Sequence, residues 1–439
     1  MQAEHATVQF AVVRRRRRHR CIGTDVPLRD ETLDKNTVLT AINETVHTLE
    51  RDESPVGSAA CDQLGIGTAE WEACRDELIE ELQSAQEWVE REDVLEQEVD
   101  DSPPVDSHEG SEFVPSNQTI ALFQSAMDEH LDDDNVGRFE PRDPKWLATL
   151  YQRLRGKVRG KIAFPHHQRP DDFRFDLSER ATVALVSDWG TGNAHASAVA
   201  AQIRTRTPDH VIHLGDVYYT GTPREMRRNF LDVWRAYGPP QSRYWALNAN
   251  HDMYSGGYGY FEHLLPAIGQ PASYFLLQNR HWRIVGLDSA YVNHSFTKPQ
   301  MDWLEGQLSG SARTILLTHH HLFSPFRKPG VKLEEWLDPH LAAGRLFAWF
   351  WGHDHYLFEF ADHRGVKCRC IGHGSLPYTP PNRRRQKHDA RIVRMEARPS
   401  PLQADKGIHG FALLRFDGPV LDIDYVDELG GIAWSERWE

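Results

Sequence analysis

The sequence predicts an α/β protein, with a domain built on a largely buried β-sheet in its second half and a separate small acidic helical region before it. Two observations carry this prediction. From residue 181 onward, apolar runs typical of buried strands alternate with amphipathic stretches typical of helices. Five strand-like runs end in Asp, Asn, His or Tyr side chains. Such clustering indicates a site along one edge of the sheet.

The length and composition suit two domains, or one large domain with an appendage. The chain has 439 residues, of which 40% are hydrophobic, and 13 tryptophans, which is ample for a large core. No apolar run approaches the roughly 18 to 20 residues of a transmembrane helix, and the N-terminus lacks a secretory signal pattern. The five cysteines are odd in number and lack zinc-site spacing, so reduced thiols are expected. We therefore expect a cytoplasmic protein with no membrane partner.

The net charge of −14 hides a strong asymmetry along the chain. Residues 21–140 contain 32 acidic and six basic side chains, whereas residues 141–439 carry a net positive charge. The mildly basic second half suits an anionic substrate.

Five segments follow from composition and periodicity. Residues 1–20 contain RRRRRHR and are interpreted as a basic disordered arm; nucleic acid as its partner is possible but not favoured, because charge alone does not read bases. Residues 21–98 predict an acidic helical module, suited to a protein partner because it has few positive charges to meet phosphates. Residues 99–117 predict a linker, 118–180 a helical lead-in, and 181–439 the catalytic domain.

In the catalytic domain the polar residues stand at the C-terminal ends of the predicted strands. ATVALVSDWG carries Asp188, HVIHLGDVYY carries Asp216 and Tyr219, RYWALNANHD ends in Asn250, His251 and Asp252, RTILLTHHH brings His319, His320 and His321, and LFAWFWGHDH brings His353 and His355. NAHASAVAAQIRTR, PREMRRNFLDVWRAY and PQMDWLEGQLSG predict helices between strands. GFALLRFDGPVLDIDYVDE predicts a hairpin that turns at Asp417 and Gly418.

These side chains indicate a particular kind of metal site. Asp, Asn, His and Tyr without Cys suit hard or borderline cations rather than a thiolate zinc site. Two cations about 3.5–4 Å apart activate a water and neutralise a phosphate, and they need one carboxylate that can bridge them. The sequence therefore indicates a two-metal hydrolase.

The order of the motifs resembles the calcineurin-like metallophosphoesterase superfamily, in particular its purple acid phosphatase branch of the tartrate-resistant type. That order is D-x-H or D-W-G, then G-D, N-H-D/E, H and G-H-x-H, and the resemblance covers about residues 181–375. SDWG lacks the first histidine of most members. Tyr219 stands three residues after Asp216, the position of that branch's iron-binding tyrosinate. The resemblance implies a four-layer αββα sandwich with two mixed β-sheets.

The resemblance also implies a ligand set. Metal one would be held by Asp188, Asp216, Tyr219 and His355, and metal two by Asp216, Asn250, His319 and His353, with Asp216 bridging. In that branch metal one is Fe(III) and metal two is Zn, Mn or Fe(II); a di-manganese centre is the alternative. His251 would contact the phosphate and protonate the leaving group, and Asp252 would orient His251. A metal-activated hydroxide would attack phosphorus in line.

Three more histidines are candidates for substrate contact: His320, His321 and His373. The first two extend the THHH run after His319, and His373 follows a later strand in IGHGSLPY. A core or turn histidine is the alternative for His373. In the N-H-D motif, Ala249 replaces a common glycine, which can add strain but removes no ligand.

The sequence thus predicts a metal-dependent phosphoester hydrolase, with a phosphomonoester as the expected substrate. The first alternative is a phosphodiesterase or nuclease of the same fold, which the basic tracts at 14–20 and 382–388 favour. The second is a non-catalytic regulatory or protein-interaction protein dominated by the N-terminal module. The complete ligand set argues against the second, because a decayed site usually loses ligands first.

Overall fold

The computed structural model describes residues 35–51, 64, 66–98, 117–133, 150–151, 154, 161–380 and 390–439. These residues fall into two compact units, one reaching residue 154 and the other starting at residue 161. The arm predicted at 1–20, almost all of the linker predicted at 99–117 and the basic tract at 382–388 lie outside the described residues.

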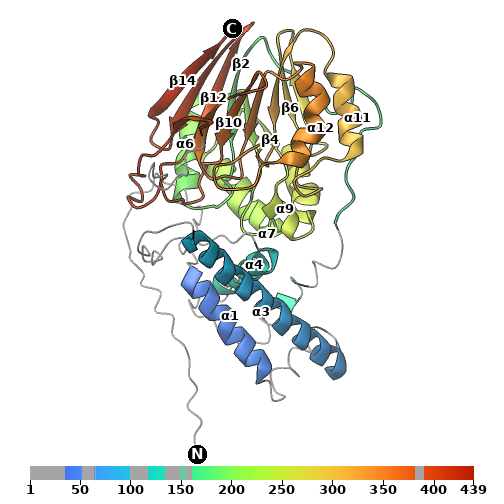
Figure 1. Cartoon of the computed structure of the whole chain (residues 1–439), viewed down its shortest axis with the longest axis vertical. Coiled ribbons are helices and arrows are strands. Elements are labelled where there is room, and N and C mark those ends of the chain that lie inside the picture. Colours follow the sequence, from blue (N-terminus) through green and yellow to red (C-terminus); the bar gives the residue numbers. More distant parts are fainter. Residues whose placement is uncertain are drawn as a thin grey trace, which may run out of the picture. The chain divides into compact units, whose positions relative to one another are not determined.

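The N-terminal unit is built from helices: α1 (Lys35–Glu50), α3 (Thr68–Glu98) and α4 (Gln118–Asp133) (Figure 1). In α1 the buried residues Val38, Ile42, Val46 and Leu49 recur at helical spacing, which gives the helix one apolar face. They share one core with apolar residues of α3 and α4. The helical character predicted for this acidic region is confirmed.

The first β-sheet of the second unit has eight strands in the order β1-β5-β6-β7-β8-β10-β9-β11. Their bounds are β1 (Arg174–Asp176), β5 (Phe275–Gln278), β6 (Trp282–Gly286), β7 (Arg313–Leu317), β8 (Ala348–Trp351), β9 (Leu357–His363), β10 (Val366–Ile371) and β11 (Ile392–Met395). Strands β6, β7, β8 and β10 run parallel, whereas β9 pairs antiparallel with β10 and β11. β1 lies inside the predicted helical lead-in, so this part of the lead-in is a strand and not a helix.

The second sheet has six strands in the order β14-β13-β12-β2-β3-β4. Their bounds are β2 (Arg180–Val186), β3 (His210–His213), β4 (Arg243–Ala246), β12 (Gly410–Asp417), β13 (Val420–Asp427) and β14 (Ile432–Trp438). β2, β3 and β4 run parallel, and β12, β13 and β14 form antiparallel hairpins. The predicted hairpin is confirmed, but its turn lies one residue later than predicted: Asp417 pairs with Val420, so the chain turns at Gly418 (φ 58°) and Pro419.

The two sheets pack face to face. Val183 and Leu185 of β2 share one buried cluster with Ile315 and Leu317 of β7, which lies in the other sheet. Leu316 of β7 points to the opposite face and belongs to a second cluster that contains helix residues. This alternation gives the four layers of the predicted αββα sandwich with two mixed sheets, and the prediction is confirmed.

Helices connect the strands of both sheets (Figure 1). Their bounds are α6 (Ala194–Arg206), α7 (Pro223–Glu225), η2 (Met226–Leu231), α8 (Asp232–Tyr237), α9 (Asn250–Tyr254), η3 (Gly259–Leu264), α10 (Leu265–Ile268), α11 (Lys298–Gln307) and α12 (Val331–Ala342). Three predicted helices are found at their expected positions. α6 follows the first strand motif, the helical run from α7 to α8 follows the second, and α11 precedes the fourth. Within the described part of the chain, no helix combines the length and the hydrophobicity that crossing a membrane requires.

Candidate metal centre

The loops that follow β2, β3, β7 and β8 bring carboxylates and imidazoles within ligand distance of one another. One group is Asp188, Asp216 and His355, and a second is Asp216, His319 and His353. Within each group, one ligand atom from every residue lies within 4.8 Å of the others. Asp216 belongs to both groups, which is the geometry that a bridging carboxylate requires.

The two carboxylates at the centre are fully buried. Burial raises the pKa of Asp188, and the negative charge of Asp216 raises it further. Burial also raises the pKa of Asp216. A cation between these carboxylates would favour their charged forms, and the imidazoles around them are neutral ligands for it. The donor set therefore fits a pair of hard or borderline cations.

Asn250 completes the second group. Its Oδ1 lies 3.0 Å from Nε2 of His319, which lies 3.2 Å from Nδ1 of His353 and 3.5 Å from Oδ2 of Asp216. The other ring nitrogen of His319, Nδ1, donates a hydrogen bond to the carbonyl oxygen of Leu214 at 3.0 Å. That bond fixes the tautomer of His319 so that the lone pair of Nε2 faces its neighbours.

The backbone at the centre is held in an uncommon conformation. Asp188, Asp216 and His353 have φ angles of 54°, 75° and 67°, in the left-handed region. Non-glycine residues there cost on the order of 1–3 kcal/mol each and occur where the surrounding structure holds them. Gly352 precedes His353 in a tight approach, because a Cβ at this position would meet Oγ of Ser187 at 1.9 Å.

The phenol beside the two carboxylates belongs to Tyr218. Its hydroxyl lies 3.1 Å from Oδ2 of Asp216 and 3.3 Å from Oδ1 of Asp188. The backbone carbonyl oxygen of Tyr219 accepts a hydrogen bond from Nδ1 of His251 at 2.6 Å. The assignment of the phenolate to Tyr219 stays a prediction, and the structure adds Tyr218 as a second candidate.

Asp252 does not orient the ring of His251 as expected. Its carboxylate accepts hydrogen bonds from the backbone N–H groups of Val217 (2.9 Å) and Ala249 (3.0 Å), and so ties together the loops after β3 and β4. The ring of His251 is held by the carbonyl of Tyr219 through Nδ1, which leaves Nε2 as its basic nitrogen. Burial lowers the pKa of His251 to about 4.

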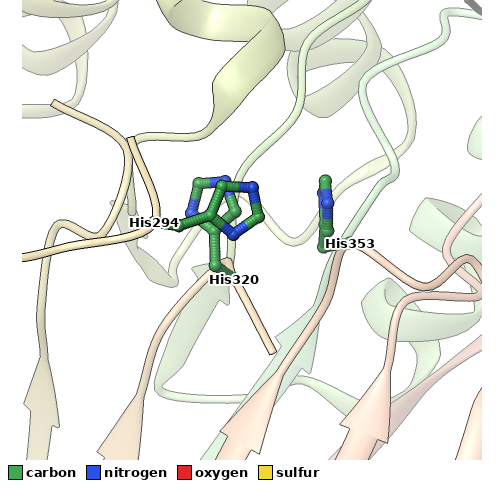
Figure 2. Close-up of side chains that lie close together, drawn as sticks. All are labelled: His294, His320 and His353. Carbon is green, nitrogen blue, oxygen red and sulfur yellow. The ribbon is translucent and has the colours of Figure 1, made fainter. Parts of the chain in front are cut away.

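A third group contains a histidine that the sequence analysis did not identify. His294, His320 and His353 each offer a nitrogen within 4.8 Å of the others, and the ring centroids of His294 and His320 are 3.9 Å apart. Figure 2 shows the rings of His294 and His320 together on one side of His353. His294 lies in the segment after β6, the neighbour of β7 in the sheet. His294 therefore also follows a strand of the sheet, as the predicted site residues do, but it stands farther from the end of its strand than they do.

Two of the predicted substrate histidines lie beside His353. Nδ1 of His320 is 2.9 Å from Oγ of Ser289, and the ring centroids of His320 and His353 are 4.9 Å apart. The ring of His321 stacks on His353 with centroids 5.5 Å apart, and its Nε2 donates to the carbonyl oxygen of Lys328 at 3.0 Å. Both histidines thus lie at the edge of the centre.

His373 has different neighbours. Its carbonyl oxygen accepts hydrogen bonds from the N–H of Gly410 and from Nδ1 of His409, at the start of β12. It is not among the clustered imidazoles, and burial lowers its pKa to about 4. Ala249 is extended (φ −135°, ψ 172°), so alanine causes no backbone strain in the N-H-D motif.

Comparisons with known proteins agree with this geometry. Residues 181–357 match the family model of the calcineurin-like phosphoesterases. Tartrate-resistant acid phosphatase type 5 of Homo sapiens is 21% identical over 309 residues, which are 60% of this chain and 93% of that protein.

Two solved structures are similar in fold. GAP50, the anchor in the inner membrane complex of Plasmodium, is 14% identical, with a TM-score of 0.45 over 59% of this chain and 89% of that chain. The purple acid phosphatase PPD1 from yellow lupin (Lupinus luteus) seeds is 15% identical, with a TM-score of 0.44 over 60% of this chain and 54% of that chain.

The segment that matches the family model contains all five strand-end motifs, from Asp188 to His355, so the match and the clustered side chains coincide. Residues 181–357 are therefore similar to the calcineurin-like phosphoesterases, and this match together with the similarity to a phosphatase supports a hydrolase of phosphoric esters.

Proposed function

We propose that the chain hydrolyses phosphomonoesters at a centre of two metal ions bridged by Asp216. The observation that carries the proposal is that Asp216, fully buried, belongs to both ligand groups. Asp188 and His355 would hold the first ion, and Asn250, His319 and His353 the second, each together with Asp216.

The donor atoms support a particular pair of ions. Two bound cations lower the pKa of a coordinated water and neutralise phosphate charge. The hydroxyl of Tyr218 lies beside both carboxylates and offers a hard phenolate oxygen to the first position. Together with the similarity to tartrate-resistant acid phosphatase, this supports Fe(III) there, with Zn, Mn or Fe(II) at the second position. A di-manganese centre is the alternative.

His251 would act on the leaving group. The carbonyl of Tyr219 holds Nδ1, so Nε2 is the nitrogen that exchanges a proton. Burial keeps the ring neutral in the free protein by lowering its pKa to about 4. A bound phosphate anion favours the protonated ring, because an opposite charge raises the pKa of a histidine. His251 can then give this proton to the departing oxygen.

The N-terminal helical unit, which has its own core, is proposed as a module separate from the chemistry. Its strongly acidic composition is suited to a protein partner rather than to a phosphoester.

The proposal is tested by metal analysis of the full-length protein together with a substrate panel of phosphomonoesters, phosphodiesters and single-stranded nucleic acids. Two metal equivalents and turnover mainly on phosphomonoesters are expected. Preference for diesters or nucleic acids would favour the phosphodiesterase or nuclease alternative. Two bound metals without turnover on any substrate would favour the non-catalytic alternative.

A further inference from the structure

A cationic side chain lies beside the metal centre on the loop between β7 and α12. Nε of Arg327 is 3.4 Å from Oδ1 of Asp354, which stands between the expected ligands His353 and His355. The side chain of Asp354 is 1% exposed, whereas that of Arg327 is 40% exposed. A solvent-accessible guanidinium is thus tethered to the turn that carries two of the ligands.

The neighbouring Phe326 fixes this part of the loop. Its ring is half exposed and lies against Tyr356, with centroids 4.8 Å apart, and Tyr356 directly follows His355. On the other side of Arg327, the carbonyl of Lys328 accepts the hydrogen bond from His321. Two contacts therefore hold the loop to the centre, one on each side of Arg327.

The turn that Arg327 contacts carries a ligand of each group. His355 belongs to the first group and His353 to the second, and Asp354 stands between them in the chain. A phosphate held between the two groups would therefore lie close to the turn that tethers this guanidinium.

We propose that Arg327 binds the phosphoryl group of the substrate and favours phosphomonoesters over phosphodiesters, an inference that rests on the proposed function. The tether uses Nε, so the two terminal nitrogens of the guanidinium can bind a second anion. Arginine suits this role because its planar fork matches two phosphate oxygens at once. A monoester dianion carries more negative charge on its non-bridging oxygens than a diester monoanion, so a fixed cation binds the monoester more tightly.

The test compares Arg327→Gln with Lys328→Gln, a substitution of the adjacent exposed cation on the same loop. Both are made in the full-length, metal-loaded protein. The dissociation constant of inorganic phosphate and the KM for an aryl phosphomonoester are measured, together with kcat/KM for the matching diester. In Arg327→Gln, phosphate affinity should fall and KM should rise roughly 10- to 100-fold, the size of a charged hydrogen bond. The diester should be affected less.

Arg327→Lys should recover part of the affinity, because it keeps the charge and loses the fork, while Lys328→Gln and the metal content should stay unchanged. Unchanged phosphate affinity and KM in Arg327→Gln, with normal hydrolysis by the wild type, would overturn the role of Arg327 and leave the proposed function standing. If the wild type hydrolyses no phosphoester but Arg327→Gln alone weakens phosphate binding, the proposed function fails and the anion contact stands. Equal losses in Arg327→Gln and Lys328→Gln would show a general charge effect and overturn the inference.

Discussion

The backbone N–H of His353 donates a hydrogen bond to Oδ2 of Asp188 at 3.0 Å. Asp188 follows β2 of the six-stranded sheet, and His353 follows β8 of the eight-stranded sheet. The bond therefore joins the ends of the two sheets at the candidate metal centre. One oxygen of Asp188 is used to position a ligand loop, while Oδ1 faces the ring of His355 at 3.5 Å.

The phenol assignment leads to a prediction about colour. A phenolate bound to Fe(III) gives a visible charge-transfer band, whereas a centre of Mn(II) or Zn(II) is colourless. Because the hydroxyl of Tyr218 lies beside both carboxylates, we expect iron-loaded Tyr218→Phe to lose the band that the wild type shows. Absorption spectra at equal iron content make the comparison.

Tyr219→Phe is the matched control, since its backbone carbonyl stays in place to hold His251. It should keep the colour. The reverse pattern, colour lost only in Tyr219→Phe, would contradict the role of Tyr218 and assign the phenolate to Tyr219, as the resemblance implies.

Substitution of His251 should affect substrates according to their leaving groups. General acid–base assistance contributes about 10²–10⁴-fold, and poor leaving groups depend on it most. His251→Ala should therefore lose far more kcat on an alkyl phosphate than on an activated aryl phosphate, with its metals retained. Equal losses on both substrates, or loss of metal, would contradict the role.

Most of the clustered side chains could be predicted because they directly follow strands, and strands are recognisable from local sequence. Asp188, His319 and His353 each stand within two residues of a strand's end, so sheet geometry alone brings them to one edge. The contact of Tyr218 with both carboxylates depends on the path of the turn after β3, which the sequence alone does not show. The contact of His294 with His320 depends on a longer segment after β6, whose path is set by tertiary packing.

The pairing expected between Asp252 and His251 failed for a related reason. Adjacent residues in a sequence suggest partners, but buried backbone groups also need hydrogen bonds. Here the N–H groups of Val217 and Ala249 donate hydrogen bonds to the carboxylate of Asp252. The ring of His251 donates instead to the backbone carbonyl of Tyr219.

Acid should destabilise the fold through His213. This residue ends β3, is buried against Phe230 with ring centroids 5.2 Å apart, and has a pKa that burial lowers to about 3. The unfolded chain has the ordinary value of about 6.5, so between these values it binds a proton that the folded chain does not. The free energy of unfolding is therefore unaffected by the titration of His213 above pH 6.5. It falls by about 1.4 kcal/mol per pH unit as the pH decreases from 6.5 toward 3, because the unfolded chain gains the proton.

His213→Leu should reduce the pH dependence of the urea midpoint below about pH 6.5. His263→Leu, a substitution of an exposed histidine in η3, should leave that dependence as in the wild type. An unchanged slope in His213→Leu would exclude His213 as a source of acid sensitivity.

The domain division predicts that a chain shortened to residues 161–439 folds and retains turnover on a small phosphomonoester. The described residues of this segment contain both sheets and every clustered ligand. Circular dichroism, metal content and kcat/KM compare it with the full chain. A folded, metal-loaded but inactive segment would show that the N-terminal helices take part in the chemistry.

The bridging role of Asp216 is tested most directly by counting metal equivalents in Asp216→Asn and measuring its hydrolysis of a phosphomonoester. The amide keeps the shape of the side chain but removes the charge that both ligand groups share. We expect the variant to lose at least one of two metal equivalents and most of its activity, while thermal unfolding shows that it still folds. Two metal equivalents and near-normal turnover in Asp216→Asn would contradict the account.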